Sequence, residues 1–281
     1  MYLSKEQKEK IKIIAFDLDG TLLNRESRLS DRTREVLEAA AEKGYHIVPA
    51  TGRVYTALPK DLETVRGWDY AVTSNGAHVM RVADDTAIYE SLIEWDAIEP
   101  VVSALMDDSV ICEIFFGGRG YIGEKSLLVL DDFVPDARRQ EYIRTTRKPV
   151  PDLEALMREH RDELENIMLL FADSAVKEQY FEYLDARPGL NVVFSQKYSF
   201  EIGGADTSKA NGLRELARLL GLSAENIISF GDSTNDIAML KASGVSVAMG
   251  NAIEPVKEAA DIVAPPNWED GLAAVVAELL E

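Results

Sequence analysis

Short apolar runs alternate with segments of helical spacing through the first seventy residues. Three of these runs predict buried strands: Ile11–Phe16, Tyr45–Ala50 and Tyr70–Thr73. Between them, residues 31–43 and 54–65 have the spacing of helices, and the first of these has Ser30 as its expected N-cap and Gly44 as its stop. Alternation of strand and helix predicts parallel βαβ units.

The pattern changes after Gly76. Residues 77–81 and 86–90 flank Asp84-Asp85 and predict a hairpin rather than another parallel step. Further strands and helices follow at Val110–Phe116, Leu153–His160, Ile167–Phe171, Val176–Leu184 and Asn191–Phe194. Residues 83–193 are therefore expected to form an inserted α/β domain with its own sheet.

The first alternation returns at Lys209. Helices are expected at Ala210–Leu220, Asp236–Lys241, Pro255–Ala260 and Leu272–Leu280, and strands at Asn226–Phe230, Val245–Ala248 and Ile262–Ala264. The predicted fold is α/β: a doubly wound, parallel-sheet (Rossmann-like) core built from residues 1–82 and 194–281, interrupted by the inserted domain.

Charge limits the partners of this chain. Its 281 residues include 30 Lys and Arg against 49 Asp and Glu, a net charge of −19. A field of that sign repels the phosphates of nucleic acids and anionic membrane surfaces, so neither is expected as a partner. It also repels a phosphorylated metabolite, and any site for one must therefore contain local cations.

The compartment is inferred from what the chain lacks. Cys112 is the single cysteine, so no intramolecular disulfide can form. The polar N-terminal segment has no apolar signal core, and no apolar run reaches the roughly 18 residues that a spanning helix needs. We expect a cytoplasmic protein, with a monomer as the default state and a dimer as the alternative.

Two acidic segments directly follow predicted strands. Asp17 and Asp19 belong to the sequence DLDGT, and Asp232 belongs to GDSTND at 231–236. Because the carboxyl ends of parallel strands meet at one edge of a sheet, these carboxylates should line a common crevice. Neighbouring carboxylates repel one another unless a cation lies between them, and Mg²⁺ prefers such oxygen ligands. The plainer alternatives are an acidic turn bent at Gly20 and, for Asp236, a charge that stabilises a helix start.

Donors and cations occur at the same predicted edge. Thr51-Gly52-Arg53 follows the second strand, and Lys209 opens the helix that restarts the core, where an ammonium can meet a phosphate. Taken alone, such a Thr or Lys is usually a cap or a solvated charge. His46, His78 and His160 have no metal-ligand spacing and are interpreted as structural or surface residues, and Gly117–Gly120 as a turn of the inserted domain.

Together these segments resemble the four core motifs of the haloacid dehalogenase superfamily, in order and spacing. DLDGT at 17–21 is similar to the first motif, Thr51 in ATGR to the second, Lys209 to the third and GDSTND to the fourth. The insertion resembles the α/β cap of the Cof-like branch, subfamily IIB, and Thr73-Ser74-Asn75-Gly76-Ala77 resembles the segment that precedes this cap. Ser233 departs from the glycine common in this branch.

The resemblance implies a Mg²⁺-dependent phosphatase of small phosphorylated metabolites, such as sugar phosphates. It implies that Asp17 forms an aspartyl-phosphate and that Asp19 is the general acid and base. Mg²⁺ would be held by Asp17, the backbone carbonyl of Asp19 and Asp232. The remaining implied roles are phosphate binding by Thr51, Gly52, Lys209 and Asn235, and support from Asp236.

Substrate recognition is assigned only to candidates: Arg53, Asn75 and, in or near the cap, Arg119 and Lys197. Two alternative functions remain open at this point. A phosphomutase of the phosphomannomutase type would return the phosphoryl group to its substrate and would depend on a sugar bisphosphate. A non-catalytic sensor of phosphorylated metabolites would have no need of both carboxylates of the first motif.

Overall fold

The computed structural model describes residues 3–281, apart from the side chains of Ser195 and Gln196, and divides the chain into two compact units. The first unit contains the residues up to Arg53, then Leu58–Glu90 and Ser208–Glu281. The second contains Val54–Ala57 and Ser91–Thr207. The division expected after residue 82 would separate two paired strands, and the division expected before residue 194 would cut through a strand. The compact units instead divide after Glu90 and before Ser208, where no strand is interrupted.

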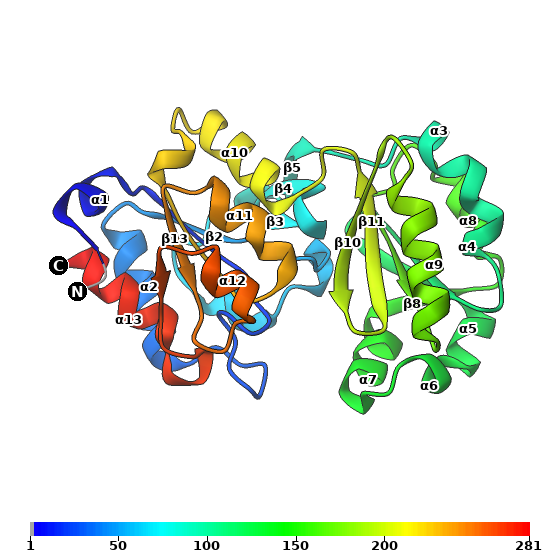
Figure 1. Cartoon of the computed structure of the whole chain (residues 1–281). Helices are drawn as coiled ribbons and strands as arrows, with labels where there is room; N and C mark the ends of the chain where they lie inside the picture. The colour runs from blue at the N-terminus through cyan, green and yellow to red at the C-terminus, as the bar shows by residue number, and fades with distance from the viewer. Residues whose placement is uncertain (1–2) are drawn as a thin grey trace. The chain divides into compact units, whose positions relative to one another are not determined.

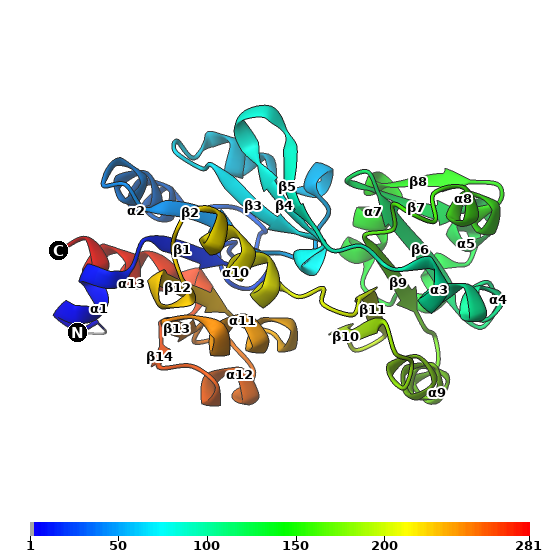
Figure 2. The same cartoon turned by 90° about the horizontal axis from the view of Figure 1, so that it is seen from above.

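A five-stranded sheet forms the centre of the first unit, in the order β14-β13-β12-β1-β2 (Figure 2). All four neighbouring pairs are parallel, as predicted. The strands are β1 (Ile13–Phe16), β2 (His46–Pro49), β12 (Ile227–Gly231), β13 (Val245–Ala248) and β14 (Ile262–Val263). Phe16 is paired with both Phe230 and Pro49, so the segments after β1, β12 and β2 begin at the same sheet edge.

Helices cover both faces of this sheet (Figure 1). Ile14 and Phe16 of β1 lie in a core with the apolar side chains of α2 and α13, whereas Ile13 and Ala15 lie in a second core with those of α10 and α11. This alternation is the two-residue period of a strand buried on both faces. The helices of the unit are α1 (Lys5–Lys10), α2 (Asp31–Glu42), α10 (Lys209–Leu219), α11 (Ile237–Ala242), α12 (Glu254–Glu258) and α13 (Gly271–Leu280).

The ends of α2 follow the predicted signals. Ser30 Oγ accepts a hydrogen bond from the Thr33 backbone N–H at 3.1 Å, which satisfies one free donor of the first turn. Gly44, just beyond the helix, has a φ of 89°, a conformation that glycine adopts without steric cost. Short 3₁₀ turns complete the unit: η2 (Lys60–Thr64), η3 (Ser74–Gly76), η4 (Val82–Asp84), η6 (Ala224–Asn226), η7 (Thr234–Asp236) and η8 (Asn267–Glu269).

A second, antiparallel sheet of the first unit has the order β3-β4-β5. Its strands are β3 (Tyr70–Thr73), β4 (His78–Arg81) and β5 (Thr86–Glu90). The predicted hairpin is confirmed by the pairing of β4 with β5. The alternation of strand and helix predicted that β3 would continue the parallel sheet. Only the isolated parallel bridges Ile47–Trp68 and Ala50–Val72 connect this segment to it, and β3 pairs along its length with β4.

The helix predicted over residues 54–65 is wrong. The segment contains only η1 (Tyr55–Ala57) and η2, which are separated by Leu58 and Pro59. Proline has no backbone N–H and disfavours helical geometry in the preceding residue, so a continuous helix cannot pass this position.

The second unit is built on a six-stranded sheet in the order β10-β11-β9-β6-β7-β8. The strands are β6 (Ile111–Phe116), β7 (Arg119–Gly123), β8 (Arg147–Val150), β9 (Asn166–Leu170), β10 (Leu190–Gln196) and β11 (Ser199–Gly204). The helices are α3 (Trp95–Ile98), η5 (Glu99–Val101), α4 (Val102–Leu105), α5 (Glu124–Leu128), α6 (Leu130–Phe133), α7 (Ala137–Thr146), α8 (Leu153–Glu159) and α9 (Ser174–Asp185). Separate apolar cores lie on its two faces.

A buried ion pair crosses one face of this sheet. Arg147 Nε on β8 lies 2.8 Å from Glu113 Oε2 on β6, although β7 runs between the two strands. Arg147 passes over Gly120 of β7, where a Cβ atom would lie 3.0 Å from Arg147 Nε. The turn predicted over 117–120 is thus shorter than expected: Gly117 and Gly118 join β6 to β7, whereas Gly120 is part of β7 and leaves room for the guanidinium.

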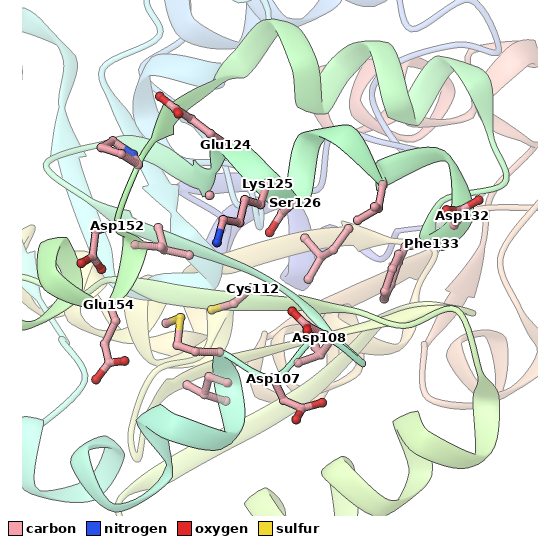
Figure 3. A pocket seen from close by; sticks show the side chains of 18 residues that line it. Asp107, Asp108, Cys112, Glu124, Lys125, Ser126, Asp132, Phe133, Asp152 and Glu154 are labelled. Atoms are coloured by element: carbon pink, nitrogen blue, oxygen red, sulfur yellow. The ribbon is translucent and has the colours of Figure 1, made fainter.

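The second unit also contains a cavity of about 620 Å³ (Figure 3). Six carboxylate side chains and a single lysine line it, together with apolar residues and Cys112: Asp107, Asp108, Glu124, Asp132, Asp152, Glu154 and Lys125. An excess of negative charge repels phosphate esters, so this cavity does not have the chemistry expected of their site. Among residues 3–281, no helix combines the length and apolar character needed to cross a membrane.

Candidate active site

The strand register brings the first and fourth motifs together in the first unit. Asp17 follows β1 and its backbone N–H donates to the Phe230 carbonyl of β12 at 3.0 Å. Thr21 Oγ1 donates to Asp232 Oδ1 at 2.9 Å, and a Cβ on Gly20, whose φ is 89°, would overlap the Asp232 carboxylate. Gly20 thus provides both the turn and the space that DLDGT needs beside GDSTND. The two motifs are therefore adjacent, and a crevice lined by their carboxylates stays a prediction.

Lys209 lies between two buried carboxylates. Its Nζ is 2.6 Å from Asp17 Oδ1 and 2.7 Å from Asp236 Oδ1, and its side chain is 1% exposed. Ile13 and Ala15 face the core shared with α10, so the same strand alternation directs Asp17 toward Lys209 at the start of that helix. An ammonium has three N–H donors. The two hydrogen bonds within the described chain leave one donor of Lys209 for a further oxygen.

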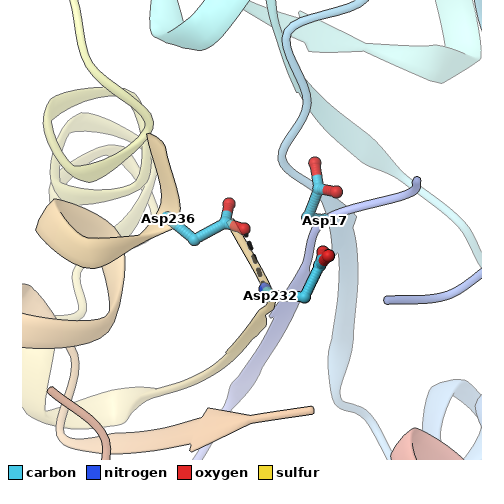
Figure 4. A group of neighbouring side chains, drawn as sticks. All are labelled: Asp17, Asp232 and Asp236. Atoms are coloured by element: carbon cyan, nitrogen blue, oxygen red, sulfur yellow. Dashed lines mark hydrogen bonds between the residues drawn. The ribbon is translucent and has the colours of Figure 1, made fainter. Parts of the chain in front are cut away.

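Asp236 shapes the loop of the fourth motif. Its Oδ2 accepts a hydrogen bond from the backbone N–H of Asp232 at 3.0 Å (Figure 4) and another from the backbone N–H of Ser233, also at 3.0 Å. Its Oδ1 accepts from Lys209. A Cβ on Gly231 would collide with the Asp236 side chain, which explains glycine at that position. Both oxygens of Asp236 are thus occupied by protein donors, as a supporting residue requires.

Burial changes the ionisation of two carboxyl groups. Desolvation raises the pKa of Asp17 to about 8, with further increases from Asp236, Asp19 and Asp232 and an opposing effect of Lys209. Desolvation and the Asp236 charge raise the pKa of Asp232 to about 7, against the hydrogen bond from Thr21. Burial alone would lower the pKa of Lys209, but its pairs with Asp17 and Asp236 raise it. Lys209 therefore stays charged.

The donor set fits a hard divalent cation. Asp17, Asp232 and Asp236 each place a carboxylate oxygen within 4.8 Å of the others. Three carboxylates against the single ammonium of Lys209 leave an excess of two negative charges when all are ionised. Because Asp236 is engaged with Lys209 and two backbone donors, Asp17 and Asp232 are the carboxylates available to a metal. No side-chain oxygen of Asp19 belongs to this group, and its backbone carbonyl stays a prediction as a ligand.

The Asp19 side chain has another partner. Arg53 Nε and Nη2 donate to its two carboxylate oxygens at 2.8 and 2.6 Å. The Asp19 side chain is 54% exposed, whereas that of Arg53 is 19% exposed. The Asp19 carboxylate is therefore paired directly with a guanidinium. Arg53, predicted as a substrate contact, binds a catalytic candidate of the chain itself.

The remaining phosphate-binding candidates gather around Asn75. Thr51 is buried, and its hydroxyl accepts from the Arg53 backbone N–H at 3.1 Å, so the hydroxyl hydrogen can still be donated elsewhere. Asn235 Nδ2 donates to Asn75 Oδ1 at 3.2 Å. A Cβ on Gly52 would lie 3.1 Å from the same Asn75 oxygen. Asn75 therefore contacts two neighbours that were predicted to bind phosphate.

Two supporting residues were missed by sequence reasoning. Asn251 Nδ2 donates to the Gly20 carbonyl at 2.8 Å, and Asn251 Oδ1 accepts from the Asn267 backbone N–H at 2.9 Å. Asn251 follows β13 in a turn and Asn267 opens η8 after β14, and neither segment has a recognisable sequence pattern. Thr21, which binds Asp232, was visible only as the last letter of DLDGT.

The residues set aside in the sequence have structural contacts. His46 packs against the Tyr70 ring, His78 Nε2 lies 3.2 Å from Glu90 Oε1, and His160 stacks on Phe116. Arg119 and Lys197 are exposed residues of the second unit. Their assignment to substrate recognition stays a prediction.

Comparison with known proteins supports the reading of the motifs. The family model of haloacid dehalogenase-like hydrolases matches residues 14–276. The 5-amino-6-(5-phospho-D-ribitylamino)uracil phosphatase YcsE of Bacillus subtilis is 29% identical over 266 residues, which cover 95% of this chain and 94% of that protein. The pyridoxal phosphate phosphatase YbhA of Escherichia coli is 30% identical over 278 residues, which cover 94% and 97%.

The fold has a matching solved structure. BT4131, described as a sugar phosphatase of haloacid dehalogenase subclass IIB, aligns with a TM-score of 0.77 and 26% identity, covering 95% of this chain and 98% of that one. The α/β fold class and the resemblance derived from the motifs are thereby confirmed. With most of its length matched by the family model, the chain belongs to the haloacid dehalogenase-like hydrolases and is a phosphoric monoester hydrolase.

Proposed function

We propose that this chain is a Mg²⁺-dependent phosphatase that hydrolyses small phosphorylated metabolites through an aspartyl-phosphate on Asp17. The observation that carries the proposal is the buried contact of Asp17 Oδ1 with Lys209 Nζ at 2.6 Å. It fixes a carboxylate beside a permanent positive charge, where an incoming phosphoryl group needs both a nucleophile and charge neutralisation.

Asp17 attacks phosphorus with its second carboxylate oxygen, Oδ2, while Oδ1 stays on Lys209. The bond from phosphorus to the leaving oxygen breaks, and the phosphoryl group is transferred to Asp17. Thr51, the Gly52 backbone N–H, Lys209 and Asn235 donate hydrogen bonds to the phosphoryl oxygens. A carboxylate nucleophile divides one difficult displacement into two easier ones.

Asp19 supplies and removes the protons. It protonates the departing alkoxide in the first step and then, as a carboxylate, accepts a proton from the water that attacks the aspartyl-phosphate. Arg53 orients Asp19 through both carboxylate oxygens. The first step leaves Asp19 as the carboxylate that the second step needs, and its half-exposed side chain is open to the attacking water.

Asp17 and Asp232, with the backbone carbonyl of Asp19, are the residues that would hold Mg²⁺. When bound, Mg²⁺ neutralises the phosphoryl charge and favours ionised carboxylates. Ionisation of Asp17 matters because burial raises the pKa of its carboxyl to about 8 in the metal-free protein, and only the carboxylate is a nucleophile. Asp236 keeps the loop of Asp232 in place through two backbone N–H groups.

The substrate is a small phosphate ester. The similar proteins YcsE, YbhA and BT4131 are described as phosphatases of a phosphoribitylamino-uracil, of pyridoxal phosphate and of sugars. We assign the choice of leaving group to the second unit, which corresponds to the predicted cap, with Arg119 and Lys197 as candidate contacts.

Phosphate release from a panel of sugar phosphates, nucleotides and phosphorylated cofactors tests this proposal. We expect release that requires Mg²⁺ and is abolished in Asp17→Asn. Asp69→Asn, a change to an acidic residue just before β3 and outside the four motifs, serves as the matched control and should retain activity. Release by Asp17→Asn at a near-normal rate would refute the mechanism. Release that depends on an added sugar bisphosphate would indicate a mutase, and binding of phosphate esters without release would indicate a sensor.

A further inference from the structure

The turn Ser74–Gly76 has an unusual backbone. Ser74 and Asn75 have φ values of 49° and 53°, and Gly76 follows with 100°, so three successive residues have positive φ. Residues other than glycine have a steric cost at positive φ, although asparagine tolerates this conformation better than most. A strained backbone persists only where its surroundings hold it in place, and such positions cluster at functional sites.

Backbone hydrogen bonds attach this turn to the second motif. The Asn75 N–H donates to the Thr51 carbonyl at 3.0 Å, and the Ser74 N–H donates to the Arg53 carbonyl at 2.9 Å. The left-handed conformation directs two successive N–H groups at the loop that carries Thr51, Gly52 and Arg53. The position of this loop therefore depends on the turn.

The opposite side of the turn contacts the start of α10. A Cβ on Gly76 would overlap the Ser208 carbonyl, and Ser208 is the N-cap residue directly before Lys209. A Cβ on Gly212 would lie 3.3 Å from Gly76 Cα. Glycines at both positions let helix and turn approach closely, which sets where Lys209 enters the site.

The Asn75 side chain completes the set of contacts. It is 8% exposed, and its Oδ1 accepts the hydrogen bond from Asn235 Nδ2 at 3.2 Å. A side-chain amide can rotate its donor and acceptor among several partners. Fixing one N–H of Asn235 on Asn75 leaves the second N–H with a defined direction.

We infer that Asn75 is a positioning residue, which aims the Asn235 amide, within a turn that also holds the 51–53 loop and the start of α10 in register. This inference rests on the proposed function, because its consequence is the alignment of the phosphoryl-binding groups. It changes the predicted role of Asn75 from substrate contact to alignment. Its effect on turnover should accordingly be independent of the leaving group.

Substituting Asn75 by glycine and by alanine distinguishes the effect of losing the side-chain amide from the effect of backbone strain. Asn75→Gly removes the amide and relieves the positive φ, whereas Asn75→Ala removes the amide and increases the strain. Both variants should lose about 10- to 100-fold in kcat/KM, by the same factor for sugar phosphates and for p-nitrophenyl phosphate. Their melting temperatures should differ, with Asn75→Gly at least as stable as the unmodified chain. If the activities of the two variants differed in parallel with their melting temperatures, instead of falling equally because both lack the amide, the inference would be overturned.

The partner residue provides the second test. In an Asn235→Ala background, Asn75→Gly should cost less than about threefold, because the amide it positions is already gone. Equal costs in the two backgrounds would overturn the proposed coupling. Losses confined to particular esters would identify a direct substrate contact. Asp85→Gly, which relieves a φ of 52° in the β4–β5 hairpin, is the matched control and should leave kcat/KM unchanged.

Binding of inorganic phosphate in the presence of Mg²⁺ gives a readout that does not require turnover. Asn75→Gly should weaken it by a factor similar to the loss in kcat/KM, measured by titration calorimetry. If the unmodified chain bound phosphate but released none from any ester, the proposed function would fail while the positioning role was still tested. Unchanged phosphate binding in Asn75→Gly would contradict the positioning role alone.

Discussion

Arg53 holds both carboxylate oxygens of Asp19, with its Nε 2.8 Å from Oδ2 and its Nη2 2.6 Å from Oδ1. Such a bidentate pair fixes the orientation of a carboxylate as well as its position. The orientation of Asp19 is thus set by another residue of the chain. The pair joins the first motif to the second, and its geometry makes a direct prediction about proton transfer.

Arg53→Lys should impair leaving-group protonation. A lysine ammonium cannot reproduce the planar two-point contact, so Asp19 loses its fixed orientation. We expect kcat/KM, which reports formation of the aspartyl-phosphate, to fall about 10- to 100-fold for alkyl phosphates and much less for p-nitrophenyl phosphate, whose leaving group needs no proton. Steady-state kinetics on the two substrate types measures this difference. Arg81→Lys, at the exposed bidentate pair with Asp84, is the matched control, and equal losses for both substrate types would contradict the positioning of Asp19.

Lys209→Met should reduce both stability and activity. The change leaves the buried carboxylates of Asp17 and Asp236 without their shared cation. Breaking a buried ion pair by removing one partner costs about 3–5 kcal/mol, and the missing charge should lower kcat by at least about 100-fold. Urea denaturation and kinetics measure the two effects. Lys257→Met, which breaks an exposed pair with Glu254, should change the free energy of unfolding by less than about 1 kcal/mol.

Metal-free protein should lose stability as the pH rises. The pKa of Asp17 is raised from 3.8 to about 8, and that of Asp232 from 3.8 to about 7. Between pH 3.8 and about 8 the folded state therefore binds more protons than the unfolded state. The free energy of unfolding then falls with increasing pH across this window. Thermal unfolding at about pH 6 and about pH 8 should show this fall, and it should be smaller in Asp17→Asn.

Added Mg²⁺ should reverse that trend. Because metal binding requires ionised carboxylates, the rise in melting temperature should be larger at about pH 8 than at about pH 6. A metal effect that was equal at the two pH values, or equal in Asp17→Asn, would argue against Asp17 as a ligand.

The buried pair in the second unit should behave as a unit. Arg147→Met leaves the Glu113 carboxylate buried at 0% exposure and without its cation, at an expected cost of about 3–5 kcal/mol. The double variant Glu113→Met/Arg147→Met should recover most of this loss, since well-packed apolar groups replace buried ion pairs at little cost. Urea denaturation of both variants checks the recovery, and a double variant less stable than the single one would contradict the account.

The core of the fold was predictable because its signals are local. β1, β3 and β13 follow apolar runs, α2 ends at its cap and its glycine, and the four motifs lie where strand register must bring them together. The second unit was harder. β7 contains two glycines, and β8 contains Arg147 and Pro149, so neither has an apolar pattern. These strands depend on pairing with distant segments, which sequence periodicity does not reveal.

In the candidate site, too, local sequence signals were predictive and contacts between distant segments were not. Asp17, Lys209, Asp232 and Asp236 were predicted from motif order and meet in the structure. The partners of Arg53 and Asn75 were not predicted, because a side chain's choice among neighbours depends on loop geometry. Pro59 shows a missed local signal, since its ring alone argues against the helix expected over 54–65.

The most direct test of the central claim is rapid quenching of the chain with a radiolabelled phosphate ester and Mg²⁺. A covalent intermediate on Asp17 predicts a protein-bound label that hydroxylamine removes, as expected of an acyl phosphate, and that maps to the peptide containing Asp17. The label should be absent in Asp17→Asn. In Asp19→Asn it should accumulate from p-nitrophenyl phosphate, because hydrolysis then lacks its general base. Full phosphate release with no labelled protein at any quench time in these variants would contradict a covalent intermediate on Asp17.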